Sequence, residues 1–199
     1  WSSDVCSSDL ERLHAIGFRG IRINIAAPTR GLRLEHAQTL APRIRDFGWH
    51  LQFYADFAKQ PEAANVLAAL PVPIVIDHFA NVPAAAGVES SGFKTLLRLL
   101  ERSNCWAKLS APYLVSQAAP RFDDLIPLAK AMMAVAADRI VWGTDWPHPS
   151  ARARMPSDAD LADILARWIP DEAMRQRVLV DNPARLYGFA DRPQIEDAK

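Results

Sequence analysis

PIVIDHF, residues 73–79, decides how the fold of this 199-residue chain is read. A short apolar run, rich in β-branched residues, leads directly into Asp77 and His78, as a buried strand does when it ends in polar side chains. Four further runs have the same character, and each carries a polar or titratable group: GIRIN (20–24), HLQFY (50–54), CWAKLS (105–110) and RIVWGTD (139–145). The sequence therefore predicts five buried strands with polar tips.

Helical patterns lie between these strands. Apolar residues recur at helical spacing over 35–47, 61–70, 93–102, 123–137 and 158–168, and Ser157 is a suitable N-cap for the last of these. A further helix is expected from residue 170 to about residue 180, where Asn182 and Pro183 should break it. Strands and helices that alternate in this way predict an α/β fold with a parallel sheet.

Two architectures fit this alternation, a doubly wound sheet and a barrel. A doubly wound nucleotide-binding fold usually has a glycine-rich turn after its first strand, and GFRG (17–20) is not that turn. Polar groups at the ends of all five strands favour a barrel, because active sites in barrels lie at that face. We therefore predict a (β/α)₈ TIM barrel of the metal-dependent hydrolase type that is incomplete, with about five C-terminal βα units present and about three absent.

The first ten residues, WSSDVCSSDL, do not match the rest of the chain, because they are rich in serine and lack periodicity. We predict that residues 1–10 are a non-native scar and that residues 11–199 form the partial barrel domain. Equal numbers of basic and acidic residues, 23 each, argue against nucleic acid or a membrane surface as partner. Two cysteines make no disulfide framework, which favours a reducing compartment and a cytoplasmic location.

Two strand ends carry the residues with the strongest catalytic potential. His78 follows its strand directly, and a neutral imidazole there can polarise a carbonyl or bind a metal. Asp145, in GTDWPHP (143–149), is suited to a general base that takes a proton from water. Structural alternatives are a hydrogen-bonded half-buried histidine and an aspartate that caps the following turn. Asp77 either orients His78 or points into the helix layer, since adjacent strand residues face opposite sides.

Other polar residues are candidates for substrate binding. Arg22 alternates with two isoleucines, so it can face the barrel and bind a carboxylate, or form an internal ion pair. Lys108 has the same two alternatives, and His148 either contacts substrate or caps a loop. Tyr54 lies at the end of its strand, and we expect Trp142 and Trp146 to be packing residues.

Taken together, GFRGIRIN, GWHLQFY, VPIVIDHF, WAKLSAPY, RIVWGTDWPHP and VDNPARLYGF resemble the amidohydrolase superfamily, in the branch called amidohydrolase family 2. Within it, the 2-pyrone-4,6-dicarboxylate lactonases are the group that the sequence resembles. The resemblance spans about residues 11–189. It implies a deformed barrel hydrolase that cleaves a lactone or ester of a small carboxylic acid. His78 and Asp145 match catalytic positions of the family, while Arg22, Tyr54 and His148 match positions that contact the substrate.

The sequence departs from the family pattern in two respects. None of the five histidines forms the His-x-His pair of the family's first strand, and no arginine occurs from Ser110 to Ala119. A further family arginine aligns best with Arg30. We therefore expect the 199-residue chain by itself to have little or no activity. The family's lactonases are thought to work without a metal; if a divalent metal such as zinc is used, His78 and Asp145 are its expected ligands.

Three functional hypotheses remain open from the sequence. The first is a lactone or ester hydrolase that acts on a small-molecule substrate. The second is a zinc-dependent decarboxylase of the same superfamily. The third is an inactive remnant that associates with another chain, as in a homo-oligomer, because the unpaired edges of an open barrel invite association.

Overall fold

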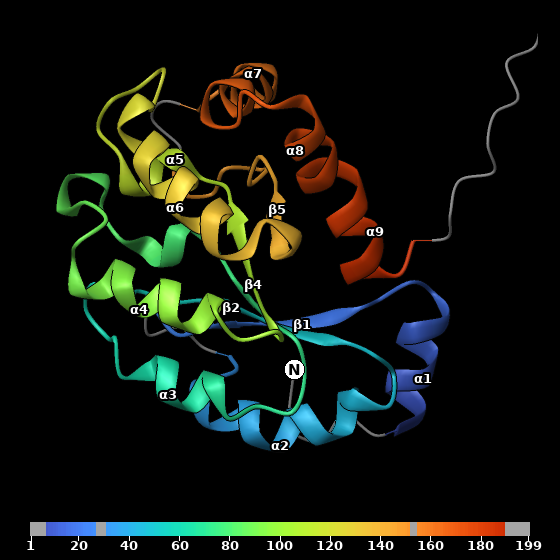
Figure 1. Ribbon diagram of the computed structural model, residues 1–199. Coiled ribbons are helices and arrows are strands. Elements are labelled where there is room, and N and C mark those ends of the chain that lie inside the picture. Colours follow the sequence, from blue (N-terminus) through green and yellow to red (C-terminus); the bar gives the residue numbers. More distant parts are fainter. Residues whose placement is uncertain (1–6, 27–30, 152–154, 190–199) are drawn as a thin grey trace, which may run out of the picture.

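The computed structural model describes residues 7–26, 31–151 and 155–189 (Figure 1). Its strands form one five-stranded sheet in which neighbouring strands run parallel, in the order β1-β2-β3-β4-β5. The strands are β1 (Gly20–Asn24), β2 (His50–Tyr54), β3 (Ile74–Ile76), β4 (Cys105–Leu109) and β5 (Ile140–Trp142). The predicted parallel α/β fold is thus confirmed, and the last three strands stop short of the polar residues that follow them.

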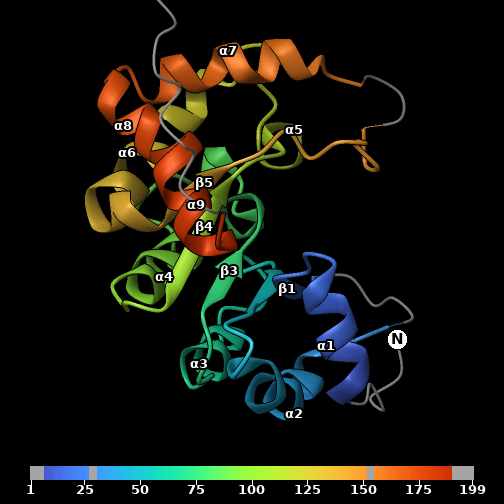
Figure 2. The same ribbon diagram turned by 90° about the vertical axis from the view of Figure 1, so that its right-hand side faces the viewer.

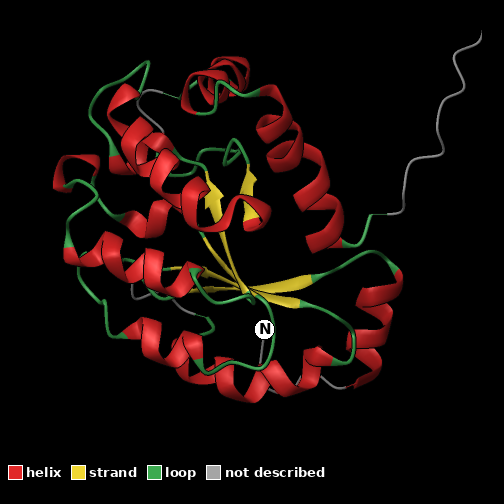
Figure 3. Cartoon of the chain, viewed as in Figure 1, coloured by secondary structure: helices red, strands yellow, loops and turns green. Residues whose placement is uncertain are grey.

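Helices connect successive strands and surround the sheet (Figure 3). They are α1 (Ser7–Ala15), α2 (Leu34–Arg45), α3 (Ala63–Ala68), α4 (Ser91–Leu100), α5 (Pro112–Val115), α6 (Ile126–Ala136), α7 (Asp158–Trp168), α8 (Glu172–Gln176) and α9 (Asn182–Tyr187). Four single turns of 3₁₀ type, η1 (His78–Asn81), η2 (Ala84–Ala86), η3 (Asp123–Leu125) and η4 (Ala137–Arg139), and one π-helical segment, η5 (Arg177–Asp181), complete the order. No helix in the described part of the chain is long and apolar enough to span a membrane.

The two faces of the sheet pack differently, and this positions the site. One face buries alternate strand residues such as Ile23, Phe53 and Ile76 in the large core with the helices. The opposite face has a small apolar cluster of Val75, Trp106 and Val141, covered by Leu186 of α9. Polar strand residues also lie on this second face, where the register pairs Arg22 with Gln52. The polar face is therefore the one that can hold a ligand.

The N-terminal helix was not expected from the sequence. Residues 7–10, which the sequence predicts to lie outside the domain, form the first part of α1, and Leu10 is buried. Residues 1–6, with Cys6, and Arg30 lie outside the described residues. The assignment of residues 1–10 as a non-native scar stays a prediction.

The C-terminal helices correct another expectation, that Asn182 and Pro183 break the last helix. The chain instead continues as α9 to Tyr187. The π-helical η5 changes the hydrogen-bond register just before Pro183, so the proline falls in the first turn of α9, where its missing N–H is tolerated. The Asn182 side chain also donates to the carbonyls of Ala137 and Ile140, at 2.9 and 2.7 Å, and so ties this junction to β5.

Packing of α4 against the loop after β2 requires a glycine. A Cβ atom at Gly92 would lie 2.7 Å from the carbonyl oxygen of Phe57, which is backbone and cannot swing away. We expect Gly92→Ala to lower the free energy of unfolding by roughly 1–3 kcal/mol, the usual cost of overpacking. Urea denaturation measures this, with the neighbouring exposed Ser91→Ala as control. Equal stability of the two variants would contradict the close approach.

Candidate active site

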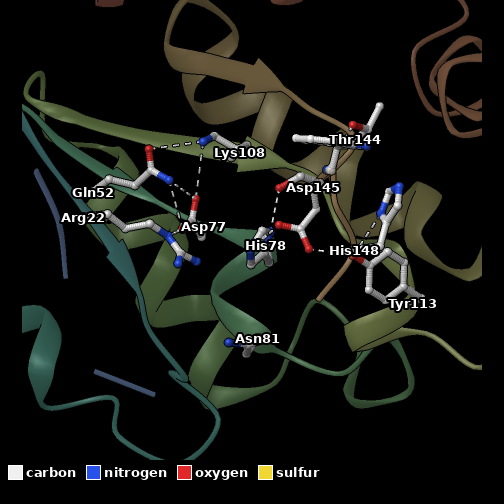
Figure 4. A network of polar contacts seen from close by, with 12 residues as sticks. Arg22, Gln52, Asp77, His78, Asn81, Lys108, Tyr113, Thr144, Asp145 and His148 are labelled. Carbon is white, nitrogen blue, oxygen red and sulfur yellow. Dashed lines mark hydrogen bonds and ion pairs between the residues drawn. The ribbon is translucent and has the colours of Figure 1, made fainter. Parts of the chain in front are cut away.

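A cavity of about 320 Å³ opens at the C-terminal ends of the strands. It is lined by residues of β1, β2, β4 and β5, by residues that follow β3, β4 and β5, and by one residue of α9: Arg22, Gln52, Asp77, His78, Lys108, Ser110, Trp142, Gly143, Thr144, Asp145, Trp146 and Tyr187. Four residues predicted for the site thus meet around one space. Figure 4 shows them in two groups, one around Asp77 and the other around Asp145.

His78 enters the cavity on an unusual backbone. It begins a turn of four residues, η1, whose φ angles are 51°, 53°, 54° and 53°, in the left-handed region that L-residues adopt at a cost of roughly 1–2 kcal/mol each. Burial of Phe79 and Ala80 and a 2.9 Å bond from Asn81 Nδ2 to the Ala55 carbonyl hold the turn. Because strand alternation ends here, the successive residues Asp77 and His78 both line the cavity.

Asp77 is the centre of a buried ion cluster. Its carboxylate accepts from Arg22 Nε at 2.8 Å and from Gln52 Nε2 at 2.8 Å, and Lys108 Nζ lies 3.5 Å away. Burial by itself would raise the pKa of Asp77, but the charges of Lys108, of His78 in its protonated form and of Arg22, together with the bond from Arg22, outweigh burial and lower the pKa. Asp77 therefore neither points into the helix layer nor hydrogen-bonds to His78.

For Arg22 and Lys108 the internal ion pair is observed. The Arg22 side chain is nevertheless 49% exposed, and its terminal nitrogens make no hydrogen bond to another described residue, so they can still reach a ligand in the cavity. Tyr54 does not line the cavity; its ring lies 5.4 Å from the Arg22 guanidinium and 5.4 Å from the ring of His78. Substrate contacts by these three residues stay predictions.

The His78 ring is bonded on one side and faces Asp145 on the other. Nδ1 lies 2.7 Å from Ser110 Oγ, and Nε2 lies 3.5 Å from Asp145 Oδ1. An ionised carboxylate can only accept, so we assign the ring proton to Nε2 and let Ser110 donate to Nδ1. Burial lowers the pKa of His78, and the nearby carboxylates of Asp77 and Asp145 do not reverse this. His78 is therefore a neutral donor whose N–H points towards the base.

Ser110 offers a direct test of this tautomer. Ser110→Ala removes the partner of Nδ1, so the ring loses its preference and the Nε2–H donor is present in only part of the molecules. We expect turnover to fall about tenfold, which corresponds to about 1.4 kcal/mol, with KM little changed. Steady-state kinetics measure this, and ¹⁵N NMR of the His78 ring follows the tautomer. Unchanged ring nitrogen shifts would contradict the assignment.

Asp145 lies in the loop after β5 and, like His78, has a left-handed backbone conformation, with φ 70°. Its Oδ2 accepts from the Tyr113 hydroxyl at 2.6 Å. Burial, followed by the bond to Asp145 and its charge, raises the pKa of Tyr113, so the phenol stays protonated. Asp145 thus has one oxygen held by Tyr113 and the other facing His78.

His148 lies behind Asp145, and it does not line the cavity. Its ring is 2% exposed, with Nδ1 3.3 Å from Tyr113 Oη and Nε2 3.1 Å from Asp158 Oδ1. Its predicted contact with substrate stays a prediction. Trp142 does pack partly against the core, but Trp146 is 75% exposed, so the expectation that it is a packing residue is wrong. Trp146 instead forms part of the cavity rim.

Sequence reasoning missed Tyr113 and gave Ser110 no role. Both follow β4 in SAPY (110–113). The signal used for the other strands, a polar side chain at the end of a buried strand, could therefore have identified them. Asp158 was counted only as the first residue of a helix. Its contact with His148 joins residues on either side of a loop, and no local pattern predicts such a contact.

The described residues do not by themselves fit a metal ion. Within residues 7–26, 31–151 and 155–189 there is no group of three or more histidine, cysteine, aspartate or glutamate side chains that could hold one. His78 Nε2 and the Asp145 carboxylate are two candidate ligands, whereas catalytic zinc sites usually have three protein ligands. These two side chains by themselves therefore do not complete a metal site.

The family profile of amidohydrolases matches residues 2–189, so the chain belongs to the amidohydrolase family. It is 33% identical over 193 residues to a 2-pyrone-4,6-dicarboxylate hydrolase of Comamonas testosteroni, covering 92% of this chain and 63% of the relative. It is 36% identical over 185 residues to a 4-sulfomuconolactone hydrolase of Rhizobium radiobacter, covering 91% and 62%. The chain therefore spans less than two thirds of the length of these relatives.

The fold is shared with solved structures over the same part of the chain. A crystal structure from Agrobacterium tumefaciens superposes with a TM-score of 0.84 at 29% identity, covering 96% of this chain and 68% of that one. The five sequential parallel strands thus form one arc of the barrel type that the sequence predicted.

Proposed function

We propose that this chain is the C-terminal part of the active-site domain of a hydrolase that cleaves a lactone or ester of a small carboxylic acid. One observation carries the proposal: Asp145 Oδ1 and His78 Nε2 lie 3.5 Å apart at the cavity, a carboxylate base beside a neutral donor. The relatives named as lactone hydrolases support the substrate class.

Each residue of the site has a separate role in the proposed reaction. Asp145 takes a proton from a water molecule, and the oxygen of that water attacks the carbonyl carbon. The Nε2–H of His78 donates to the oxyanion that develops on the carbonyl oxygen. When the carbonyl forms again, the C–O bond to the lactone or ester oxygen breaks, and Asp145 returns its proton to that leaving oxygen. The free end of Arg22 binds the substrate's acid group, which Tyr54 helps to position through its contact with the guanidinium.

The net charge of the ion cluster indicates how many acid groups of the substrate it can bind. Arg22 and Lys108 carry two positive charges, and Asp77 cancels one of them. Residues 110–119 contain no arginine that could add to this balance. We therefore propose that the described part of the site binds one carboxylate group of the substrate, and that any second acid group needs a partner outside it.

The alternatives have separate tests. A divalent metal such as zinc would need further ligands beyond the described residues, so metal analysis of the full-length protein distinguishes a zinc-dependent decarboxylase from our proposal. An inactive associating remnant would show no turnover and form oligomers in size-exclusion chromatography. We propose a cytoplasmic protein with a small-molecule substrate. The buried Cys105, whose pKa burial raises to about 12, is an unreactive thiol that fits such a compartment.

The experiment that tests the function uses the full-length protein, meaning this chain with whatever residues its gene encodes before and after it. We expect it to open 2-pyrone-4,6-dicarboxylate, 4-sulfomuconolactone or a monocarboxylate lactone, seen as loss of lactone absorbance and appearance of the hydroxy or keto acid. Release of carbon dioxide from a carboxylic acid without lactone opening would overturn the proposal in favour of the decarboxylase.

A further inference from the structure

We propose that Tyr113, itself fixed by His148 and Asp158, is a positioning residue that holds the Asp145 carboxylate in the orientation in which one of its oxygens faces His78 and the cavity. The inference rests on the proposed function, because it assigns Asp145 the role of base. Tyr113 comes from α5, after β4, and Asp158 is the first residue of α7. The residues therefore link three separate parts of the chain around one carboxylate, and Figure 4 shows Tyr113 and His148 beside Asp145. Figure 2 shows α5 below α7.

The contacts form a continuous chain. Tyr113 Oη lies 2.6 Å from Asp145 Oδ2 and 3.3 Å from His148 Nδ1, and His148 Nε2 lies 3.1 Å from Asp158 Oδ1. The His148 ring also packs edge-on against the Tyr113 ring, with centroids 5.8 Å apart. This series of contacts leads from Asp145 at the cavity, through the buried His148, to Asp158, whose side chain is 47% exposed.

The direction of the hydrogen bonds follows from the groups themselves. The Asp158 carboxylate can only accept, so Nε2 of His148 donates to it and Nδ1 is left as an acceptor. Tyr113 then has one hydroxyl proton for two acceptors. Since Asp145 is nearer by 0.7 Å (3.3 Å less 2.6 Å), the proton points to Oδ2. With the proton on that side, the edge-on packing of the His148 ring, which Asp158 holds in place, is what keeps the phenol ring from turning away.

The loop between the two acceptors explains why such a support is needed. Asp145 and His148 both have left-handed backbone, with φ 70° and 55°, and the His148 N–H donates to the Asp145 carbonyl at 2.7 Å. The side chains at the two ends of this strained turn, Asp145 and His148, both contact the Tyr113 hydroxyl. With Oδ2 held there, Oδ1 is the oxygen that faces His78 and the cavity. Without the phenol, the carboxylate loses this hydrogen bond and can turn out of the orientation that directs an oxygen at His78.

A double-mutant cycle tests whether the residues act through one another. In the full-length protein we expect Tyr113→Phe to lower kcat about tenfold and Asp158→Ala about threefold, with KM within about twofold in both, because the substrate contacts remain. The double variant should lose no more than Tyr113→Phe alone, since Asp158 acts only through Tyr113. Multiplied losses, about thirtyfold in the double variant, would overturn the proposal.

Asp160→Ala is the matched control. Asp160 lies in the same first turn of α7 and is exposed like Asp158, but its side chain makes no hydrogen bond or ion pair with another described residue. We expect Asp160→Ala to retain full activity. Equal losses of kcat in Asp158→Ala and Asp160→Ala would mean that Asp158 acts only through its negative charge at the start of α7.

A second measurement does not depend on turnover. The ring nitrogen resonances of His78 should move in Tyr113→Phe and in Asp158→Ala, because the orientation of the Asp145 carboxylate relative to Nε2 changes, and should stay in place in Asp160→Ala. Resonances that stay in place in all three variants would overturn the positioning role. Absence of lactone turnover in the wild-type protein, with these shifts present, would instead count against the proposed function.

Discussion

Asp145→Asn is expected to lower kcat for lactone hydrolysis by about 10²–10⁴-fold in the full-length protein, the usual contribution of a general base. The amide has the shape of the carboxylate and can keep an oxygen towards the Tyr113 hydroxyl, but it cannot take a proton from water. KM should change little, because Arg22, which we propose holds the substrate acid group, is untouched. Initial rates over a range of lactone concentrations measure both constants.

Asp56→Asn is the control for this result. Asp56 follows β2 at the same end of the sheet, pairs with Lys59 at 3.0 Å and does not line the cavity, so the same chemical change should leave kcat intact. Full lactone turnover by Asp145→Asn would show that another group activates the water, and the mechanism proposed here would be wrong.

The sequence predicted the sheet well because buried parallel strands have a local signature. The ranges predicted for β1 and β2, and for the helix α7 with its Ser157 cap, coincide with the structure. The errors lie where the backbone departs from regular geometry. The left-handed turn that begins at His78 and the π-helical segment before Pro183 are both decided by tertiary contacts, and residue order alone does not reveal them.

The candidate site was predictable only in part, for a related reason. Strand-end positions identified His78 and Asp145 as residues on one edge, and the structure brings them together. It could not be predicted that Arg22 and Lys108 would share Asp77, because alternation along a strand places Asp77 opposite His78. The η1 turn breaks that alternation at the point where it matters for the chemistry.

Asp77→Ala is expected to cost roughly 3 kcal/mol in the free energy of unfolding, because removing one partner of a buried pair leaves the other charge uncompensated. Arg22 Nε, Lys108 Nζ and Gln52 Nε2 would all lose the carboxylate that they contact. Urea unfolding measures the loss. The control is Asp46→Ala, which removes an exposed pair with Arg45 and should change stability by less than about 0.5 kcal/mol. Equal losses would mean that the cluster adds nothing beyond a surface pair.

Acid pH distinguishes the charge of Asp77 from its packing. The pKa of Asp77 is lower in the folded chain than its ordinary value near 3.9, so its charge stabilises the fold above that value, and the contribution is lost as pH falls through the folded pKa. The stability difference between Asp77 and Asp77→Ala should therefore stay constant from about pH 7 to pH 5 and shrink below about pH 4. The comparison belongs in a His78→Gln background, because the charge of Asp77 also affects the pKa of His78. A difference that persists unchanged at pH 2.5 would assign the loss to the cavity left by the side chain and not to the charge of Asp77.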